Sequence, residues 1–267
     1  MSGRPPRKFR LSPTVFAIGE VKIGGMRHRL LLPLLFVLPM GVRAEDPPVR
    51  PVIRVGEVLT YRVNSSRFGD IGTAVMRVDE DTAQGQLVYR LSFAFKGRVL
   101  LFTVSDETRS WVDMATLSSV RYSKRERTPI GNRDEAVEMN PAAGVWSDAR
   151  GEHPLANHAP MDELAFIYFV RGLPMTFDEM NIARHFDAER NPVVFRRIGQ
   201  ELVSAPGGDR PAAVIEMRVP DERQKGGFST LRFYISDDDE RLPLRIDSSM
   251  PMAGTMKLTL ESVTVGQ

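Results

Sequence analysis

Hydrophobic and polar residues alternate with a period of two along three consecutive segments near the C-terminus. These segments are residues 230–236, 241–247 and 256–261, and short stretches rich in Asp, Pro and Gly separate them. Such alternation is typical of β-strands with one buried face, so the sequence predicts an antiparallel meander here. Pro243 lies inside the middle strand and cannot donate a backbone hydrogen bond, so either regular pairing begins after it or a bulge lies there, and we expect a kink at residues 242–244.

The same alternation recurs through the preceding chain. Two early segments each direct one apolar row toward the predicted core: Leu59, Tyr61 and Val63, and then Ala74, Met76 and Val78. The strongest strand pattern follows the Gln84-Gly85 turn and gives a longer inward row: Leu87, Tyr89, Leu91, Phe93 and Phe95. Gly97 is expected to end this strand, and the apolar residues 99–104 predict a strand covered on both faces.

Residues 160–171 break the β pattern and predict a helix. Asp162 and Glu163 follow Pro160, and the first turn of a helix favours proline and negative charge because its backbone amides are free. A Gly-Leu-Pro sequence directly after residue 171 is expected to end the helix. Apolar residues lie nearly all round it, so we expect it to be largely buried against the concave side of the sheet.

Together these patterns predict a mainly β protein. Successive short strands joined by Gly-, Pro- and Asp-rich turns are typical of antiparallel sheets. We expect roughly a dozen strands in a strongly curved antiparallel sheet or half-open barrel, with one buried helix. The chain length is compatible with a single domain of this kind over residues 56–267.

The N-terminal segments have a different pattern. Residues 26–44 combine a basic start, an apolar core and small residues near Ala44, which predicts a secretory signal peptide cleaved after Ala44. An apolar core of about 13 residues spans only roughly 20 Å as a helix, so a cleaved signal is favoured over a transmembrane anchor. Residues 1–25 are either an unusually long basic extension of the signal or precede the true initiator, Met26. Residues 45–55 are Pro-rich and predict a flexible leader.

Charge is distributed unevenly along the chain. The formal net charge is +2, with 36 basic and 34 acidic residues, but residues 1–44 hold eight of the basic residues and one of the acidic ones. The remainder therefore has 28 basic and 33 acidic residues, a net charge of −5, which leaves no basic field for nucleic acid. The absence of cysteine excludes disulfides, thiolate metal sites, a cysteine nucleophile and a lipid-modified cysteine.

Few residues suggest catalysis or metal binding. His153, His158 and Asp162 are of the types that bind zinc, but a polar loop and a helix-start carboxylate explain their spacing better. The acidic residues 237–240 suit calcium, but they fit a solvated hairpin turn better. His185 is expected on the surface of a strand. The sequence contains no nucleophile elbow, phosphate loop or dinucleotide motif, so we predict no catalytic residue, no metal and no cofactor.

Several segments together resemble a bacterial family of exported proteins, domain of unknown function 3108. They are Val-Gly-Glu-Val-Leu-Thr-Tyr at residues 55–61, Ile-Gly-Thr-Ala at 71–74, the predicted helix with Gly-Leu-Pro at 162–174, and Tyr-Ile-Ser-Asp-Asp with Arg-Leu-Pro-Leu-Arg-Ile within 234–246. The resemblance spans nearly all of the predicted domain. The family tends to have a serine at the position of Ala165, so no catalytic serine is carried over to this chain.

The resemblance implies a periplasmic or outer-envelope β protein with a strongly curved sheet. Its shape is expected to be similar to that of the lipoprotein carriers, in which a half-open barrel wraps a helical lid around an apolar cavity. The family has no assigned activity. We therefore expect a periplasmic, non-catalytic protein that binds an apolar ligand or envelope component in a concave sheet. The alternatives are an envelope scaffold or accessory subunit that contacts another protein and, least favoured, a metal-dependent hydrolase.

One strand and the helix supply the residues that we expect to line an apolar site. They are Tyr89, Leu91, Phe93, Phe95, Phe166, Tyr168, Phe169 and Arg171. A stripe of this kind more often forms core than a cavity, and an arginine at the end of a buried helix more often has a structural partner than a ligand. The expected partners are a lipophilic small molecule or an envelope protein, with no nucleic acid and no transmembrane anchor once the signal is removed.

Overall fold

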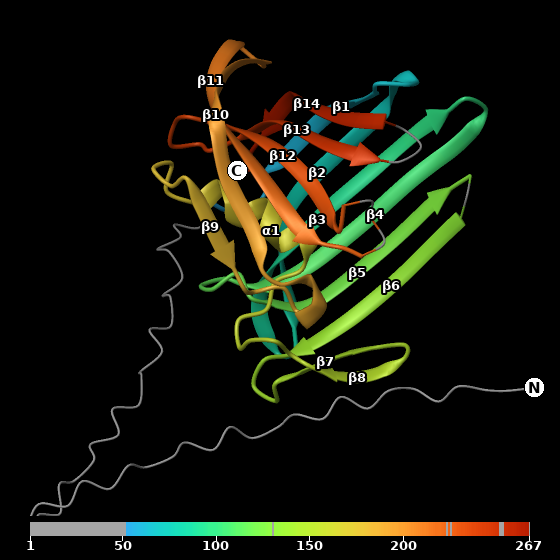
Figure 1. Ribbon diagram of the computed structural model, residues 1–267, viewed down its shortest axis with the longest axis vertical. Helices are drawn as coiled ribbons and strands as arrows, with labels where there is room; N and C mark the ends of the chain where they lie inside the picture. Colours follow the sequence, from blue (N-terminus) through green and yellow to red (C-terminus); the bar gives the residue numbers. More distant parts are fainter. Residues whose placement is uncertain (1–51, 130, 223, 225, 251–253, 267) are drawn as a thin grey trace, which may run out of the picture. The chain divides into compact units, whose positions relative to one another are not determined.

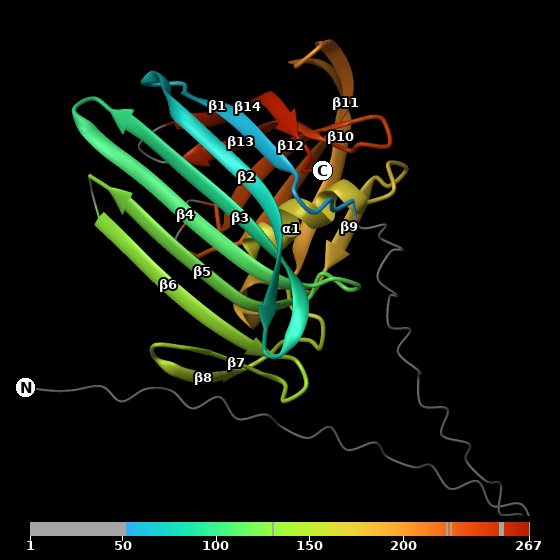
Figure 2. The same cartoon turned by 180° about the vertical axis from the view of Figure 1, so that it is seen from behind.

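The sheet is continuous and antiparallel, and it curves around one short α-helix (Figure 1, Figure 2). The computed structural model describes residues 52–129, 131–222, 224, 226–250 and 254–266. The predicted extension (1–25), the signal peptide (26–44) and most of the leader (45–55) lie outside these residues. The described part of the chain is mainly β, as the sequence predicted.

Fourteen strands are present in the described residues, against the dozen or so expected. They are β1 (Val58–Ser65), β2 (Gly69–Ala83), β3 (Gln86–Val99), β4 (Phe102–Asp113), β5 (Ser119–Thr128), β6 (Gly131–Asn140), β7 (Val145–Asp148), β8 (Gly151–Pro154), β9 (Glu179–Ile182), β10 (Val193–Ala205), β11 (Gly208–Pro220), β12 (Phe228–Ser236), β13 (Pro243–Met250) and β14 (Gly254–Thr264). The helical elements are α1 (Glu163–Phe169), its 3-10 continuation η1 (Val170–Gly172), and η2 (Ala188–Arg190).

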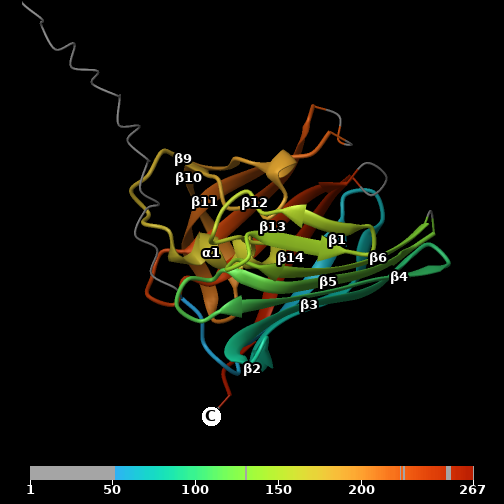
Figure 3. The same cartoon turned by 90° about the horizontal axis from the view of Figure 1, so that it is seen from below.

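The strand order places the first and last strands, β1 and β14, in the middle of the sheet. Strands that follow one another in the chain are paired, except β8 and β9, and β1 also pairs with β14. The two free edges are therefore β8 and β9, and the segment that connects them contains α1 (Figure 1; Figure 3 shows α1 and the β9 edge from below). We call the face of the sheet that packs against α1 the inner face, and the opposite face the outer face.

The main core lies between α1 and the inner face. It joins side chains from the helix with side chains from β1–β4 and β9–β14. The two predicted rows on β1 and β2 are buried there, as expected. A second, smaller cluster lies at β5–β7 and includes Trp146, whose ring forms a T-shaped contact with that of Phe186.

The predicted bulge in the closing meander is confirmed. Tyr234 of β12 pairs with Arg245, but the next residue, Ile235, pairs with Pro243, so the register shifts by one residue there. Tyr61 of β1 donates a hydrogen bond from its hydroxyl to the carbonyl of Pro243, at 3.0 Å. The bulge thus places the Pro243 carbonyl where it accepts a hydrogen bond inside the core. This contact uses the carbonyl and does not need the backbone amide hydrogen that proline lacks.

The pattern around the longest hairpin was interpreted wrongly at three points. Leu87 is exposed, because β4 reaches only as far as Val88 and leaves the start of β3 without a neighbour on that side. Gly97 does not end β3; a side chain there would collide with the Ile71 carbonyl, so glycine permits close approach to β2. Residues 99–104 form a hairpin that is exposed from Leu100 to Thr103, rather than a strand covered on both faces.

The region after the helix also differs from the prediction. His185, which was expected on a strand, is not in one: β9 ends at Ile182, and His185 forms only an isolated bridge with Met161. His185 is fully buried rather than on the surface. Its ring stacks on Phe186, with centroids 4.7 Å apart, and it lies 3.7 Å from the Glu163 carboxylate. A single histidine in an irregular pattern gave no signal of this burial.

The helix starts later than Pro160 because Asp162 caps it. The Asp162 carboxylate accepts hydrogen bonds from the amides of Leu164 and Ala165, so the first helical residue is Glu163. The helix then packs against β10, where the Phe195 ring lies 6.1 Å from Phe166 and 6.0 Å from Phe169.

We expect Phe195→Ala to reduce the free energy of unfolding by about 3–5 kcal/mol, because it leaves a cavity between α1 and β10. Leu202→Ala, on the exposed part of the same strand, should change it by less than about 0.5 kcal/mol. Urea unfolding followed by circular dichroism measures both. Equal effects of the two substitutions would contradict this packing.

Candidate functional site

The structure gathers the side chains that were expected to line an apolar site. Leu91, Phe166, Tyr168 and Phe169 are core residues with almost no exposed surface. The other apolar residues of the set are partly buried and pack against that core: Tyr89, Phe93 and Phe95. The contacts to the core explain most of the set, and a role in ligand binding stays a prediction for all of it.

Phe93 and Phe95 lie beyond the part of the inner face that the helix start occupies. Ser110, on the neighbouring strand β4, contacts the capping residue of α1, whereas Phe93 and Phe95 pair with Thr108 and Asp106. These two rings therefore lie nearer to the end of the sheet where the β3–β4 hairpin turns. We call Phe93 and Phe95 the aromatic row.

A partly buried charged group lies beside the aromatic row. The Lys124 ammonium of β5 is 2.9 Å from the Asp106 carboxylate and 3.8 Å from that of Glu126. The Thr108 hydroxyl donates a hydrogen bond to the same Asp106 carboxylate, at 2.7 Å. The inner face thus changes from apolar under α1 to a mixture of rings and paired charges toward the hairpin turns. Such a surface suits a molecule with an apolar body and a polar end.

A buried carboxylate joins the helix to β4 and β5. Asp162 accepts a 2.5 Å hydrogen bond from the Ser110 hydroxyl, and its own amide donates to the Ser119 hydroxyl at 3.0 Å. Burial raises the pKa of Asp162 to about 6, although the hydrogen bonds from Ser110 and the Ala165 amide oppose this shift. The predicted helix-start carboxylate is therefore a fully enclosed structural group.

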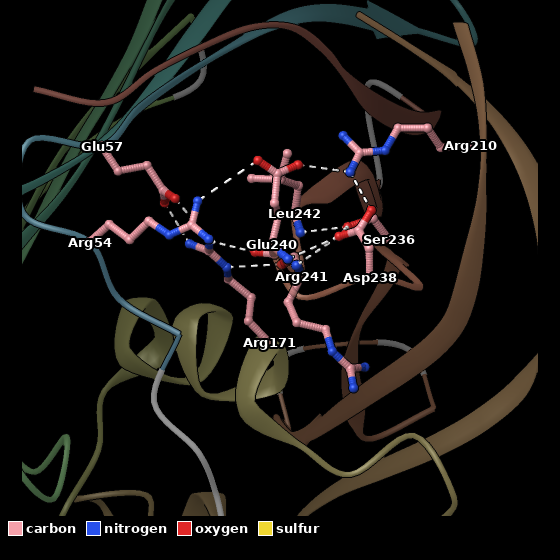
Figure 4. Close-up of polar contacts among 9 residues, drawn as sticks. All are labelled: Arg54, Glu57, Arg171, Arg210, Ser236, Asp238, Glu240, Arg241 and Leu242. Carbon is pink, nitrogen blue, oxygen red and sulfur yellow. Dashed lines mark hydrogen bonds and ion pairs between the residues drawn. The ribbon is translucent and has the colours of Figure 1, made fainter. Parts of the chain in front are cut away.

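The ion pair between Glu57 and Arg171 is the second buried polar contact (Figure 4). The guanidinium donates to both carboxylate oxygens, at 2.6 and 3.0 Å, and both side chains are almost completely buried. It also donates to the backbone carbonyls of Arg241, at 3.0 Å, and Glu240, at 3.4 Å. Arg171 therefore has structural partners for its donors, and it joins the end of the helical segment to the start of β1 and to the acidic turn.

The acidic turn before β13 forms internal contacts that explain its composition. Asp238 accepts hydrogen bonds from the Ser236 hydroxyl and from the Glu240 amide, which is the behaviour expected of a turn-forming aspartate. Arg210 forms ion pairs with Asp238 and Glu240 (Figure 4). The turn is thus a structural hairpin, in agreement with the favoured prediction.

The three residues considered as zinc ligands are separated by their surroundings. His153 stacks on Trp146 with ring centroids 4.2 Å apart, His158 is exposed, and Asp162 is enclosed as the helix cap. In the part of the chain that the structure describes, no three metal-binding side chains come together. Nothing in this geometry favours the metal-dependent hydrolase.

Sequence reasoning gave no indication of a depression on the outer face of β2–β4. Its volume is about 470 Å³, and Arg77, Arg90, Arg109 and Trp111 contribute to its lining. Arg90 forms ion pairs with Asp79 and Asp81, and the Trp111 indole donates to Asp81 at 2.9 Å. The hydrogen bond from Trp111 lowers the pKa of Asp81, so this carboxylate stays charged and pairs with Arg90. Most charges here are balanced by neighbours, which favours a structural role.

The fold and these contacts define an open, strongly curved antiparallel sheet wrapped around one helix. Residues 60–261 match the family described as "Protein of unknown function (DUF3108)", and the chain belongs to this family. The resemblance seen in the sequence is thereby confirmed. A search of curated proteins found no match.

A solved structure with a similar fold is the beta-barrel-like protein of domain of unknown function DUF1849 from Brucella abortus. The two chains superpose with a TM-score of 0.53 at 12% sequence identity, over 80% of this chain and 100% of the other. At this identity the similarity shows the fold alone. Among the described residues, no helix has the length and apolar character needed to cross a membrane.

We expect Arg171→Met to reduce the free energy of unfolding by about 3–5 kcal/mol, because it leaves the Glu57 carboxylate buried without a partner. The double variant Glu57→Gln/Arg171→Met should lose less than the sum of the two single variants, since it removes both charges. Urea unfolding of all four proteins gives the coupling free energy. If the loss of the double variant equalled the sum of the losses of the two single variants, the two charges would not stabilise each other directly, and the prediction would be contradicted.

Asp162→Asn tests the buried carboxylate, since asparagine also caps helices but does not titrate. The folded pKa of about 6 lies above the ordinary value, so the folded state binds the proton more tightly than the unfolded state. The wild-type protein should therefore lose about 2 kcal/mol of stability relative to Asp162→Asn as the pH rises from 4 to 7. Urea unfolding at four pH values measures the difference, and parallel profiles would contradict it.

Proposed function

We propose that the protein is a non-catalytic binding protein of the bacterial cell envelope that holds an apolar or amphipathic molecule on its inner face. The observation that carries this proposal is the aromatic row, whose two rings keep exposed surface beside an otherwise filled core. The sheet is open at β8 and β9, so its inner face has no closing strand in the described residues.

The chemistry of the aromatic row supports an amphipathic ligand. Phenylalanine rings bury large apolar areas with few rotatable bonds, and a few well-placed polar groups commonly orient a ligand in such sites. Lys124 is held beside the rings by Asp106 and Glu126. An acyl chain against Phe93 and Phe95 would leave a polar end group near these charges.

The periplasm is the compartment that we propose for this activity. Support comes from the signal-peptide pattern at residues 26–44 and from the absence of cysteine, which suits an exported protein. The net negative charge of residues 45–267 also suits a protein that does not bind nucleic acid.

A second candidate function is that of an envelope scaffold or accessory subunit. The edge strands β8 and β9 have only four residues each, and each pairs on one side only. The unpaired side of an edge strand can accept a strand from another protein. The first proposal is preferred because the partly exposed rings are on the inner face rather than at these edges.

Native mass spectrometry of the protein from a periplasmic extract of its host tests the first proposal. We expect an added mass that corresponds to a lipophilic molecule. Phe93→Glu should reduce its occupancy at least tenfold, since a charge would then face the apolar part of the ligand. Ala94→Glu is the matched control, because the adjacent side chain lies on the outer face and is exposed.

Phe93→Ala, with circular dichroism, separates a loss of binding from a loss of folding, and it should also lower the occupancy. The ligand proposal would be contradicted if native mass spectrometry of the wild-type protein showed only the mass of the protein and if added palmitate did not bind. Absence of the protein from the periplasmic extract would contradict the compartment.

A further inference from the structure

The β3–β4 hairpin ends in consecutive exposed apolar residues. Its two-residue turn consists of Leu100 and Leu101, which are 71% and 93% exposed, and Phe102 directly after the turn is 56% exposed. The views from two directions show that this hairpin projects at one end of the sheet (Figure 1, Figure 3). Single exposed apolar residues are common on folded proteins, but three consecutive ones at a projecting turn require an explanation.

Neither folding nor solubility explains leucines in this turn. Leu100 has a φ of 55°, a backbone conformation that favours glycine, asparagine or aspartate and is disfavoured for a leucine. Two-residue hairpin turns usually contain those small or polar residues. The chain therefore has apolar side chains at a place where turn geometry and water both oppose them, which points to a contact outside the molecule.

Two basic residues of β3 lie just before the turn. Lys96 and Arg98 are exposed on the same strand, and neither forms an ion pair with any residue that the structure describes. The sequence from residue 95 to residue 104 contains these two basic residues and no acidic one. The hairpin thus combines an apolar tip with a positively charged base, although the chain after residue 44 has a net negative charge.

Further apolar side chains lie at the same end of the sheet. The antiparallel strand order places the β1–β2 and β11–β12 connections at the end that carries the β3–β4 turn. Phe68, in the β1–β2 turn, and Phe228, at the start of β12, are each 37% exposed. The Arg218 guanidinium lies 4.2 Å from the centroid of the Phe228 ring. This end therefore presents rings and cations together.

We propose that the β3–β4 hairpin is a membrane-contact site that inserts its tip into the headgroup region of an anionic lipid bilayer. Large apolar side chains at the boundary of the acyl chains, with lysine or arginine at the level of the phosphates, are the features of interfacial binding. A projecting two-residue turn offers little of the area that a stable protein–protein interface needs, whereas a bilayer adapts to its shape.

The contact would also be useful for the proposed ligand binding. The aromatic row and the tip are on the same strand, so a bilayer at the tip would lie close to the rings that we propose for an apolar ligand. The membrane contact nevertheless depends only on the hairpin, and it stands or falls independently of any ligand on the inner face.

Sedimentation with vesicles of phosphatidylethanolamine and phosphatidylglycerol tests the proposal. We expect the protein purified from its host to bind these vesicles, and Leu100→Ser/Leu101→Ser to weaken binding at least tenfold. Leu202→Ser is the matched control, because this leucine on β10 is 73% exposed and lies toward the opposite end of the sheet. It should bind within twofold of wild type. Lys96→Glu/Arg98→Glu should weaken binding to the anionic vesicles, and high salt should do the same.

The absence of cysteine from the chain allows a direct probe of insertion. An environment-sensitive fluorophore on Leu101→Cys should increase its emission and shift it to the blue when vesicles are added, while the same label on Leu202→Cys should not respond. Wild-type protein that does not sediment with the vesicles would overturn the proposal, whatever native mass spectrometry shows for a ligand. Equal losses for the tip variant and the Leu202→Ser control would also overturn it, as would a label at residue 101 that responds only to a purified envelope protein.

Discussion

The contact on which the arrangement of the domain depends is the buried ion pair between Glu57 and Arg171. Transfer of two charges from water into the core costs several kcal/mol for each ion, and the attraction between them offsets this cost only when the geometry is good and the other donors are satisfied. Here the pairing is bidentate, and two backbone carbonyls of the acidic turn accept the remaining hydrogen bonds. The pair therefore holds three distant parts of the chain in one geometry: the start of β1, the end of the helical segment and the turn before β13.

That constraint determines where the helix lies, and hence which part of the inner face remains exposed. Arg171 fixes the end of the helical segment near β1, and Asp162 fixes its start against Ser110 of β4. The helix is thus held at both ends over one part of the sheet. The rings of Phe93 and Phe95 lie outside that part and keep some exposed surface. The partly exposed aromatic row beside a filled core follows from two polar contacts, rather than from the apolar stripe itself.

Local patterns predicted the elements of this fold better than their contacts. Alternation identified most strands, and Pro243 predicted the bulge, because both depend on neighbours in the sequence. The burial of His185 and the pairing of Glu57 with Arg171 depend on residues far apart in the chain, so no local signal reveals them. For the candidate site, the sequence grouped apolar residues of β3 and the helix that the structure brings to one core, but it did not separate those under the helix from those beyond it, since this depends on where α1 is anchored.

The error at residues 99–104 has a physical origin. A run of apolar residues has the same composition whether it is a strand covered on both faces or a hairpin that contacts something outside the chain. The turn residues normally resolve this ambiguity, but here the positions that would carry asparagine or glycine carry Leu100 and Leu101. A sequence that departs from turn chemistry at its most exposed point is inconsistent with a role confined to folding. The same departure that misleads the sequence prediction is therefore the strongest indication that this end of the sheet meets an apolar phase.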